Sequence, residues 1–188
     1  MRILTLILLL PIFSTAQQLD LVWKLKWGMK YDSAINFIKK SRNITPHSIK
    51  GDTSIMVTVE YRNQLFDGHK AFATLFYFLG NRLLRSEIFF VNESKDDSKT
   101  FTLFDSIKTK VTSKYFEPQY CDDAEDYTQA EKMKAIKQKD ANYYCNWFFP
   151  KDDDSEKGGK LNLQITNQGV VLLIYDYAKA DRIKNTDF

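Results

Sequence analysis

An aromatic–glycine turn that runs directly into an amphipathic helix places the strongest constraint on the fold of this chain. The stretch is WGMKYDSAINFIKK, residues 27–40. Asp32 and Ser33 lie where early polar groups can meet the free backbone N–H groups of a helix, and Pro46 cannot continue one. Apolar side chains recur at the i, i+3, i+4, i+7 spacing of one helical face: Tyr31, Ala34, Ile35 and Ile38. We therefore predict a helix here whose entry turn sets its angle onto a sheet.

Three strand-like runs follow this helix, and three more follow a second helical stretch. The runs span residues 54–62, 71–79, 82–91, 143–149, 161–165 and 170–177. The second helix is predicted from a cap at Ser98 or Thr100 to about Phe116, ahead of Pro118. We expect residues 44–52 to form a loop, and residues 117–140 to form an irregular excursion with a helical turn or two.

This order predicts an α+β fold, built from two α-βββ pseudo-repeats that form an antiparallel sheet with the helices packed on one face. The halves span about residues 17–92 and 93–188. Their sequences do not visibly match, so the repeat is structural. The length suits one α+β domain over residues 17–188, and 44% hydrophobic and 14% aromatic residues suffice for a core.

The first 16 residues have the pattern of a secretory signal peptide. Arg2 precedes an apolar run over residues 3–13, and Ser14 and Ala16 place small residues at the −3 and −1 positions. The alternative, a membrane anchor, needs about 20 apolar residues. We therefore expect an exported chain, periplasmic or extracellular, with no transmembrane segment after cleavage.

The two cysteines, Cys121 and Cys145, are the only ones in the chain. An exported protein meets an oxidising compartment, so a disulfide between them is one interpretation. The alternative is a pair of unpaired thiols with Cys145 buried in a strand. Two cysteines without matched histidines do not form a zinc site.

Composition and motifs argue against several functions. Without Arg2 the chain has 26 basic and 24 acidic residues, too small a surplus to indicate nucleic-acid binding. The two histidines, His47 and His69, fall beside turn residues, and no G-x-S-x-G motif occurs. Acidic runs at residues 122–126 and 152–156 lack calcium-loop spacing and are interpreted as solvated loops. We predict no catalytic residue, metal or cofactor.

The sheet face that the helices leave uncovered is the best remaining candidate for a binding site. Tyrosine and arginine are common anchors at binding surfaces. The alternative is that these residues are ordinary sheet and core side chains. Residues able to lie on that face are Tyr77, Arg85, Glu87, Tyr144, Asn146 and Tyr175.

The Trp27-Gly28-Met29 turn before the helix resembles the W-G-x-(S/T) entry of small exported α/β domains, although Lys30 replaces the capping Ser or Thr. The hydrophobic stretch 76–90 and the later run from Trp147 to Tyr175 fit the same pattern. The order resembles the outer-membrane assembly lipoproteins of the SmpA/OmlA type and the tandem domains of β-lactamase-inhibitor-like proteins, and it is similar to exported proteins of Bacteroidetes-type bacteria. The lipobox of the assembly lipoproteins is absent. The resemblance implies a binding or accessory domain.

Three hypotheses follow. The first is an exported, non-enzymatic binding or accessory protein that uses its sheet face to hold a protein or glycan partner. The second is a small secreted hydrolase that uses acidic residues, for which Glu60 and Glu87 are the candidates, because both lie on predicted strands and could approach each other. The third is a structural domain whose sheet edge pairs with another chain.

Overall fold

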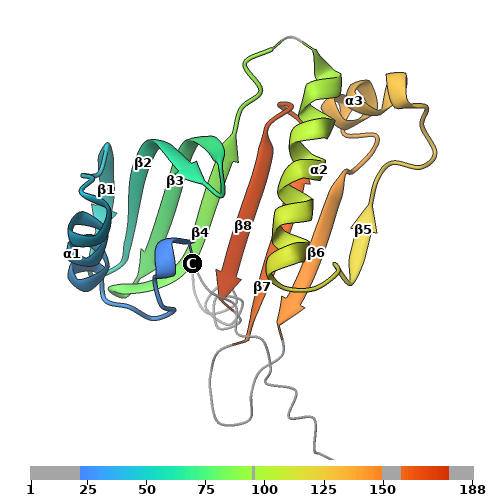
Figure 1. Cartoon of the computed structure of the whole chain (residues 1–188). Coiled ribbons are helices and arrows are strands. Elements are labelled where there is room, and N and C mark those ends of the chain that lie inside the picture. Colours follow the sequence, from blue (N-terminus) through green and yellow to red (C-terminus); the bar gives the residue numbers. More distant parts are fainter. Residues whose placement is uncertain (1–21, 95, 150–157, 178–188) are drawn as a thin grey trace, which may run out of the picture.

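The computed structural model describes residues 22–94, 96–149 and 158–177. Over these residues the chain forms three α-helices, a short 3-10 helix and one antiparallel sheet of eight strands (Figure 1). The helices are η1 Val22–Lys24, α1 Tyr31–Arg42, α2 Asp97–Lys114 and α3 Gln129–Gln138. The strands are β1 Ser48–Asp52, β2 Met56–Phe66, β3 His69–Leu79, β4 Arg82–Phe90, β5 Tyr120–Asp122, β6 Tyr144–Phe149, β7 Gly159–Ile165 and β8 Val171–Tyr177.

The strand order is β1-β2-β3-β4-β8-β7-β6-β5, so the last strand of the chain lies in the middle of the sheet. All neighbours are antiparallel, and β4 pairs with β8 over residues 85–90 and 171–176. The prediction of an α+β fold with an antiparallel sheet is therefore confirmed. Within the described residues, no helix is long and apolar enough to cross a membrane.

Two predictions about irregular segments are wrong. The expected loop over residues 44–52 contains β1, and the excursion over residues 117–140 contains β5 as well as α3. Both strands are short and lie at opposite edges of the sheet, where few of their side chains are buried. An edge strand of this kind has no buried face and so carries no hydrophobic alternation to reveal it.

The entry turn of α1 is held by the β3–β4 hairpin. Gly28 N–H donates to the carbonyl of Leu83 at 3.0 Å, and Leu83 N–H donates to the carbonyl of Met29 at 3.0 Å. The side chain of Asn81 accepts from Tyr31 N–H at 3.0 Å and so caps the helix from another element. Lys30 is the N-cap residue and its side chain does not cap the helix, while Asp32 lies in the first turn as expected.

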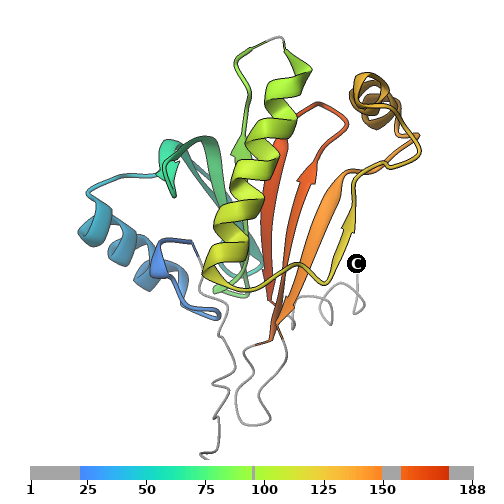
Figure 2. The same ribbon diagram turned by 45° about the vertical axis from the view of Figure 1, so that its right-hand side comes forward.

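The core lies between the sheet and the helices α1 and α2, which cover the same face (Figure 2). Alternate residues of every long strand point to these helices. In β8 these are Val171, Leu173 and Tyr175, and each is at most 1% exposed. They join one hydrophobic cluster with Ala34 and Ile38 of α1, and with Phe101, Phe104, Ile107 and Val111 of α2. The other face of the sheet, which we call the open face, carries the intervening residues.

Candidate functional site

The open face is the candidate site, and strand register defines which residues it contains. Tyr77 pairs with Arg85, and Arg85 pairs with Asp176. One row further along the strands, Leu75 pairs with Glu87 and Glu87 pairs with Ile174. Because paired residues point to the same side of a sheet, these side chains form two adjacent rows across β3, β4 and β8.

A connected group of charged and polar side chains occupies the centre of this face. Arg85 Nε donates to Glu87 Oε1 at 2.8 Å, and its Nη1 lies 3.2 Å from Asp176 Oδ1. The hydroxyl of Tyr77 donates to Glu87 Oε2 at 2.6 Å. We call Tyr77, Arg85, Glu87 and Asp176 the central network. Three strands contribute to it, so the pairing of the strands fixes the relative positions of its members.

Burial and charge act together on the acid–base properties of the central network. Burial by itself lowers the pKa of Arg85, but the charges of Asp176 and Glu87 outweigh it and leave that pKa above its ordinary value. Burial raises the pKa of Tyr77, and the hydrogen bond to Glu87 raises it further. Both effects keep Arg85 charged and Tyr77 neutral, so the network keeps its hydrogen-bonding pattern across the physiological pH range.

A second group of open-face residues lies on β5, β6 and β7. Tyr120 and Tyr144 have ring centroids 5.6 Å apart, and Phe148 is 48% exposed with the Lys160 ammonium 5.5 Å from its ring. Between these aromatic side chains, Asn146 accepts from Asn162 Nδ2 at 2.9 Å. The arrangement offers flat apolar rings beside amide groups whose orientation is fixed.

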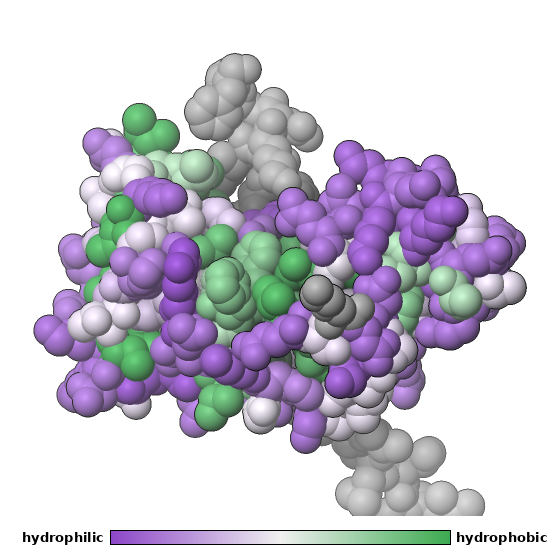
Figure 3. All heavy atoms as spheres, turned by 90° about the horizontal axis from the view of Figure 1, so that it is seen from above, coloured by the Kyte–Doolittle hydropathy of each residue, from purple (hydrophilic) through white to green (hydrophobic). Residues whose placement is uncertain are grey.

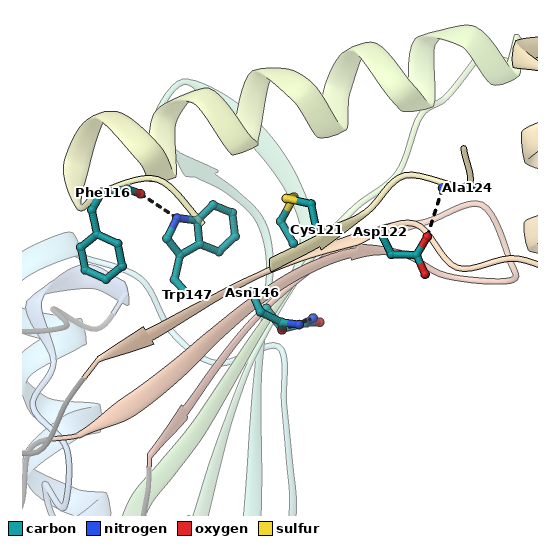
Figure 4. The surroundings of a disulfide bond; sticks show 8 residues. Phe116, Cys121, Asp122, Ala124, Asn146 and Trp147 are labelled. Carbon is teal, nitrogen blue, oxygen red and sulfur yellow. Dashed lines mark hydrogen bonds between the residues drawn. A yellow bond between two sulfur atoms is a disulfide. The ribbon is translucent and has the colours of Figure 1, made fainter. Parts of the chain in front are cut away.

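The structure places five of the six predicted binding residues on the open face. Tyr77, Arg85 and Glu87 lie together in the central network, and Tyr144 and Asn146 lie on β6. Figure 4 shows Asn146 and its neighbour Trp147 pointing to opposite sides of the sheet, with Trp147 directed to the helix side. Trp147 is fully buried and donates to the carbonyl of Phe116 at 2.8 Å.

The expected position of Tyr175 is wrong. This residue is 1% exposed and pairs with Ser86 and Leu161, both of which face the helices. Its neighbour Asp176 faces the open side and completes the central network, and it was missed by the sequence reasoning. The available signal was the alternation in β8, where Asp176 is the one charged residue between two tyrosines.

Cys121 and Cys145 form a disulfide, which confirms that interpretation of the sequence (Figure 4). They lie directly opposite each other on β5 and β6, so the bond fastens an edge strand to its neighbour. The acidic segment that follows, residues 122–126, lines a shallow hollow of about 430 Å³. Asp122 accepts from Ala124 N–H at 3.2 Å, the internal bond of a tight turn.

Of the two acidic runs in the sequence, the structure describes only the first, residues 122–126. Among the residues the structure describes, no group of three or more His, Cys, Asp or Glu side chains is placed to hold a metal ion. Residues 152–156, the second acidic run, lie outside the described residues. The first run is therefore interpreted as a solvated turn next to the disulfide.

The arrangements that could serve hydrolysis are incomplete. Glu60 and Glu87 are separated by Leu75, with which both pair across the sheet. The pKa of Glu60 is lowered, mainly by the hydrogen bond from Arg62. A general acid must hold its proton near neutral pH, so a carboxyl group with a lowered pKa is unsuited to that role.

Ser106 and His69 also lie close together, with Oγ and Nε2 separated by 3.1 Å. Ser106 belongs to the middle of α2, where backbone N–H groups are used within the helix and cannot form an oxyanion hole. Among the described residues, no carboxylate is hydrogen-bonded to the other ring nitrogen of His69. The pair ties the start of β3 to α2.

Comparisons with known proteins do not indicate a function for this chain. No protein-family model matches the chain, and neither the characterised proteins nor the solved structures contain a match.

Proposed function

We propose that this chain is an exported, non-enzymatic binding or accessory protein that holds a protein partner on the open face of its sheet. The observation that carries the proposal is the central network. Tyrosine and arginine dominate the energetic centres of protein interfaces. Here Tyr77 and Arg85 are both immobilised by Glu87, so little side-chain entropy is lost when a partner docks.

The surroundings of the network favour a protein over a glycan as the partner. Apolar side chains fill the next rows of the open face, and register places them side by side: Ala73, Leu75, Phe89, Leu172 and Ile174. Of these, Ala73, Leu172 and Ile174 are at most 8% exposed. Protein interfaces commonly combine such an apolar centre with a polar rim. Exposed aromatic residues at β5 and β6, Tyr120 and Phe148, extend the surface towards one edge.

The breadth of this face follows from the way the two halves of the chain join. The first half contains α1 and the strands β1 to β4, the second half contains α2, α3 and the strands β5 to β8, and the halves meet at β4 and β8. We interpret this order as two pseudo-repeats, in each of which the expected α-βββ unit has an additional short edge strand, β1 or β5, and the second of which also contains α3. The join makes one continuous face across both halves.

Export is part of the same proposal. The signal-peptide pattern predicted at residues 1–16, which lie outside the described residues, and the disulfide between Cys121 and Cys145 both suit an oxidising compartment. The resemblance to exported assembly lipoproteins and inhibitor-like tandem domains supports an accessory role, since neither group acts through catalysis. The hydrolase alternative is less well supported, because Arg62 and Arg85 engage the two glutamates that it would need.

Site-specific photo-crosslinking in living cells tests this proposal. A benzophenone amino acid replaces Phe148 or Tyr120 on the open face, and replaces Lys40, an exposed residue of α1, in the control. We expect a discrete protein adduct from the open-face positions that the control position does not give. Adducts of equal yield from Lys40, or binding of a polysaccharide without any protein adduct, would contradict a protein partner.

A further inference from the structure

A cleft lies on the helix side of the molecule, away from the open face. It has a volume of about 510 Å³ and is bounded by η1, the end of α1, the β2–β3 turn, the end of α2 and β8. Figures 1 and 2 both show η1 between α1 and α2. The volume lies within the range typical of small-molecule sites in proteins.

Aromatic side chains form much of the wall of this cleft. Trp23 comes from η1, Phe37 from α1, Phe66 from the end of β2 and Tyr175 from β8. Viewed from above, hydrophobic side chains gather near the middle of the molecule with hydrophilic ones around them (Figure 3). Walls of this composition favour a ligand with a flat apolar body.

Positive charge is concentrated at the same cleft. Lys24, Arg42 and Lys114 line it, and among the described residues Asp67 is the only acidic residue in its lining. The guanidinium carbon of Arg42 lies 4.7 Å from the centre of the Trp23 ring. Among the described residues, no carboxylate forms an ion pair with Arg42, so its hydrogen-bond donors are available to an anion.

Two buried polar groups that lack partners lie next to the cleft, behind its wall. The indole N–H of Trp23 is buried, and no acceptor lies within hydrogen-bonding distance among the described residues. Tyr61 packs edge-on against Trp23, with centroids 5.3 Å apart, and its buried hydroxyl has no partner either. Buried polar groups without partners are rare and costly, and a bound ligand is one way to satisfy them.

The backbone at Trp23 is held in an unfavourable conformation. Trp23 has φ 59° and Lys24 has φ 61°, the left-handed region that bulky residues seldom occupy. Strained residues persist where the surrounding structure holds them, and they concentrate at ligand sites. In this chain the strained backbone conformation directs the Trp23 ring towards Arg42 and Tyr61.

From these observations we infer that the cleft binds a small amphipathic anion, a carboxylate or sulfonate attached to a flat aromatic body. The apolar body lies among Trp23, Phe37 and Tyr175. The anionic group meets the guanidinium of Arg42 beside the Trp23 ring. This site is separate from the open face and does not depend on the function proposed for it.

Titration of the purified chain with 2-naphthoate tests the inference, with the neutral 2-naphthalenemethanol as the matched ligand. The readout is the side-chain indole N–H resonance of Trp23 in nuclear magnetic resonance spectra, assigned with Trp23→Phe. We expect the naphthoate to shift this resonance and to bind about tenfold more tightly than the alcohol, because the charged interaction with Arg42 is absent for the alcohol.

Two arginine variants give the decisive comparison. Arg42→Gln, at an exposed position, should weaken naphthoate binding by about tenfold and leave the alcohol unaffected. Arg62→Gln is the control, because Arg62 also stacks on an aromatic ring, that of Phe72 at 5.6 Å, but lies outside the cleft. Equal affinities for the two ligands, equal effects of the two variants, or no shift of the Trp23 resonance would overturn the inference.

Discussion

The hydroxyl of Tyr77 on β3 donates a 2.6 Å hydrogen bond to Glu87 on β4, while Arg85 engages the other oxygen of the same carboxylate. Glu87 is only 8% exposed, so water cannot replace a partner that is removed. The bond therefore matters both for the stability of the sheet and for the shape of the open face.

Replacing Tyr77 with phenylalanine should lower the free energy of unfolding by about 1 to 3 kcal/mol, the usual cost of leaving a buried acceptor without its donor. Urea denaturation followed by circular dichroism measures this. Tyr127→Phe is the control, because the Tyr127 hydroxyl forms only an exposed 3.4 Å bond to the carbonyl of Asp140 and should change stability by less than about 0.5 kcal/mol. Equal effects of the two variants would show that Glu87 does not depend on Tyr77.

Stability should decline as the pH rises above about 10, the ordinary pKa of tyrosine in an unfolded chain. Burial raises the pKa of Tyr61 to about 12 in the folded state, with a smaller effect from Tyr31. Burial, aided by Asp105 and Asp123, raises that of Tyr143 to about 12. Between these pH values the unfolded chain has lost protons that the native chain retains, so the free energy of unfolding falls with pH.

Urea midpoints between pH 9 and 11.5, with absorbance at 295 nm to follow tyrosine ionisation, measure that decline. Tyr61→Phe should reduce its slope, because one of the tyrosines with a raised pKa is gone. A free energy of unfolding that is constant over this range would mean that these hydroxyls are not protected in the folded state.

The sequence was sufficient to predict the elements with strong periodicity. The helical spacing of Ala34 and Ile38 and the strand alternation of Val57 and Val59 both match the observed buried faces. The site was predicted in part for the same reason, since alternation alone places Tyr144 and Asn146 on one face of β6. In β8, by contrast, nearly every residue is apolar or aromatic, and only the charged Asp176 indicated that its neighbour Tyr175 faces the helices.

Other features could not be predicted because they depend on residues far apart in the chain. The cap of α1 comes from Asn81, which is 50 positions away from Tyr31. The cleft on the helix side of the sheet combines Trp23, near the start of the described residues, with Tyr175, near their end. Local spacing contains no information on such pairs, which only the strand order β4-β8 and the helix packing bring together.

Removing the disulfide should destabilise the fold by about 3 kcal/mol, since it closes a loop between residues 24 positions apart. The double variant Cys121→Ala, Cys145→Ala gives this value in urea denaturation. Native-state hydrogen exchange should show faster exchange in β5, which has only β6 as a neighbour, and unchanged protection at the β4–β8 pairing. Uniform loss of protection across the sheet would show instead that the bond supports the whole fold.

Among the glycines whose surroundings the structure describes, Gly51 should tolerate an added side chain least well. Its φ is 101°, and a Cβ there would lie 2.1 Å from the carbonyl oxygen of Met56 on β2, so Gly51→Ala has to displace β1 from its neighbour. Gly28→Ala is the matched control: its φ is 69°, and a Cβ would meet nothing within 4 Å. We expect a loss of about 1 kcal/mol for Gly28→Ala, the cost of left-handed backbone alone, and about 2 to 4 kcal/mol for Gly51→Ala. Thermal and urea denaturation of both variants measure the difference, and a Gly51→Ala loss no larger than that of Gly28→Ala would mean that β1 adjusts freely at the edge of the sheet.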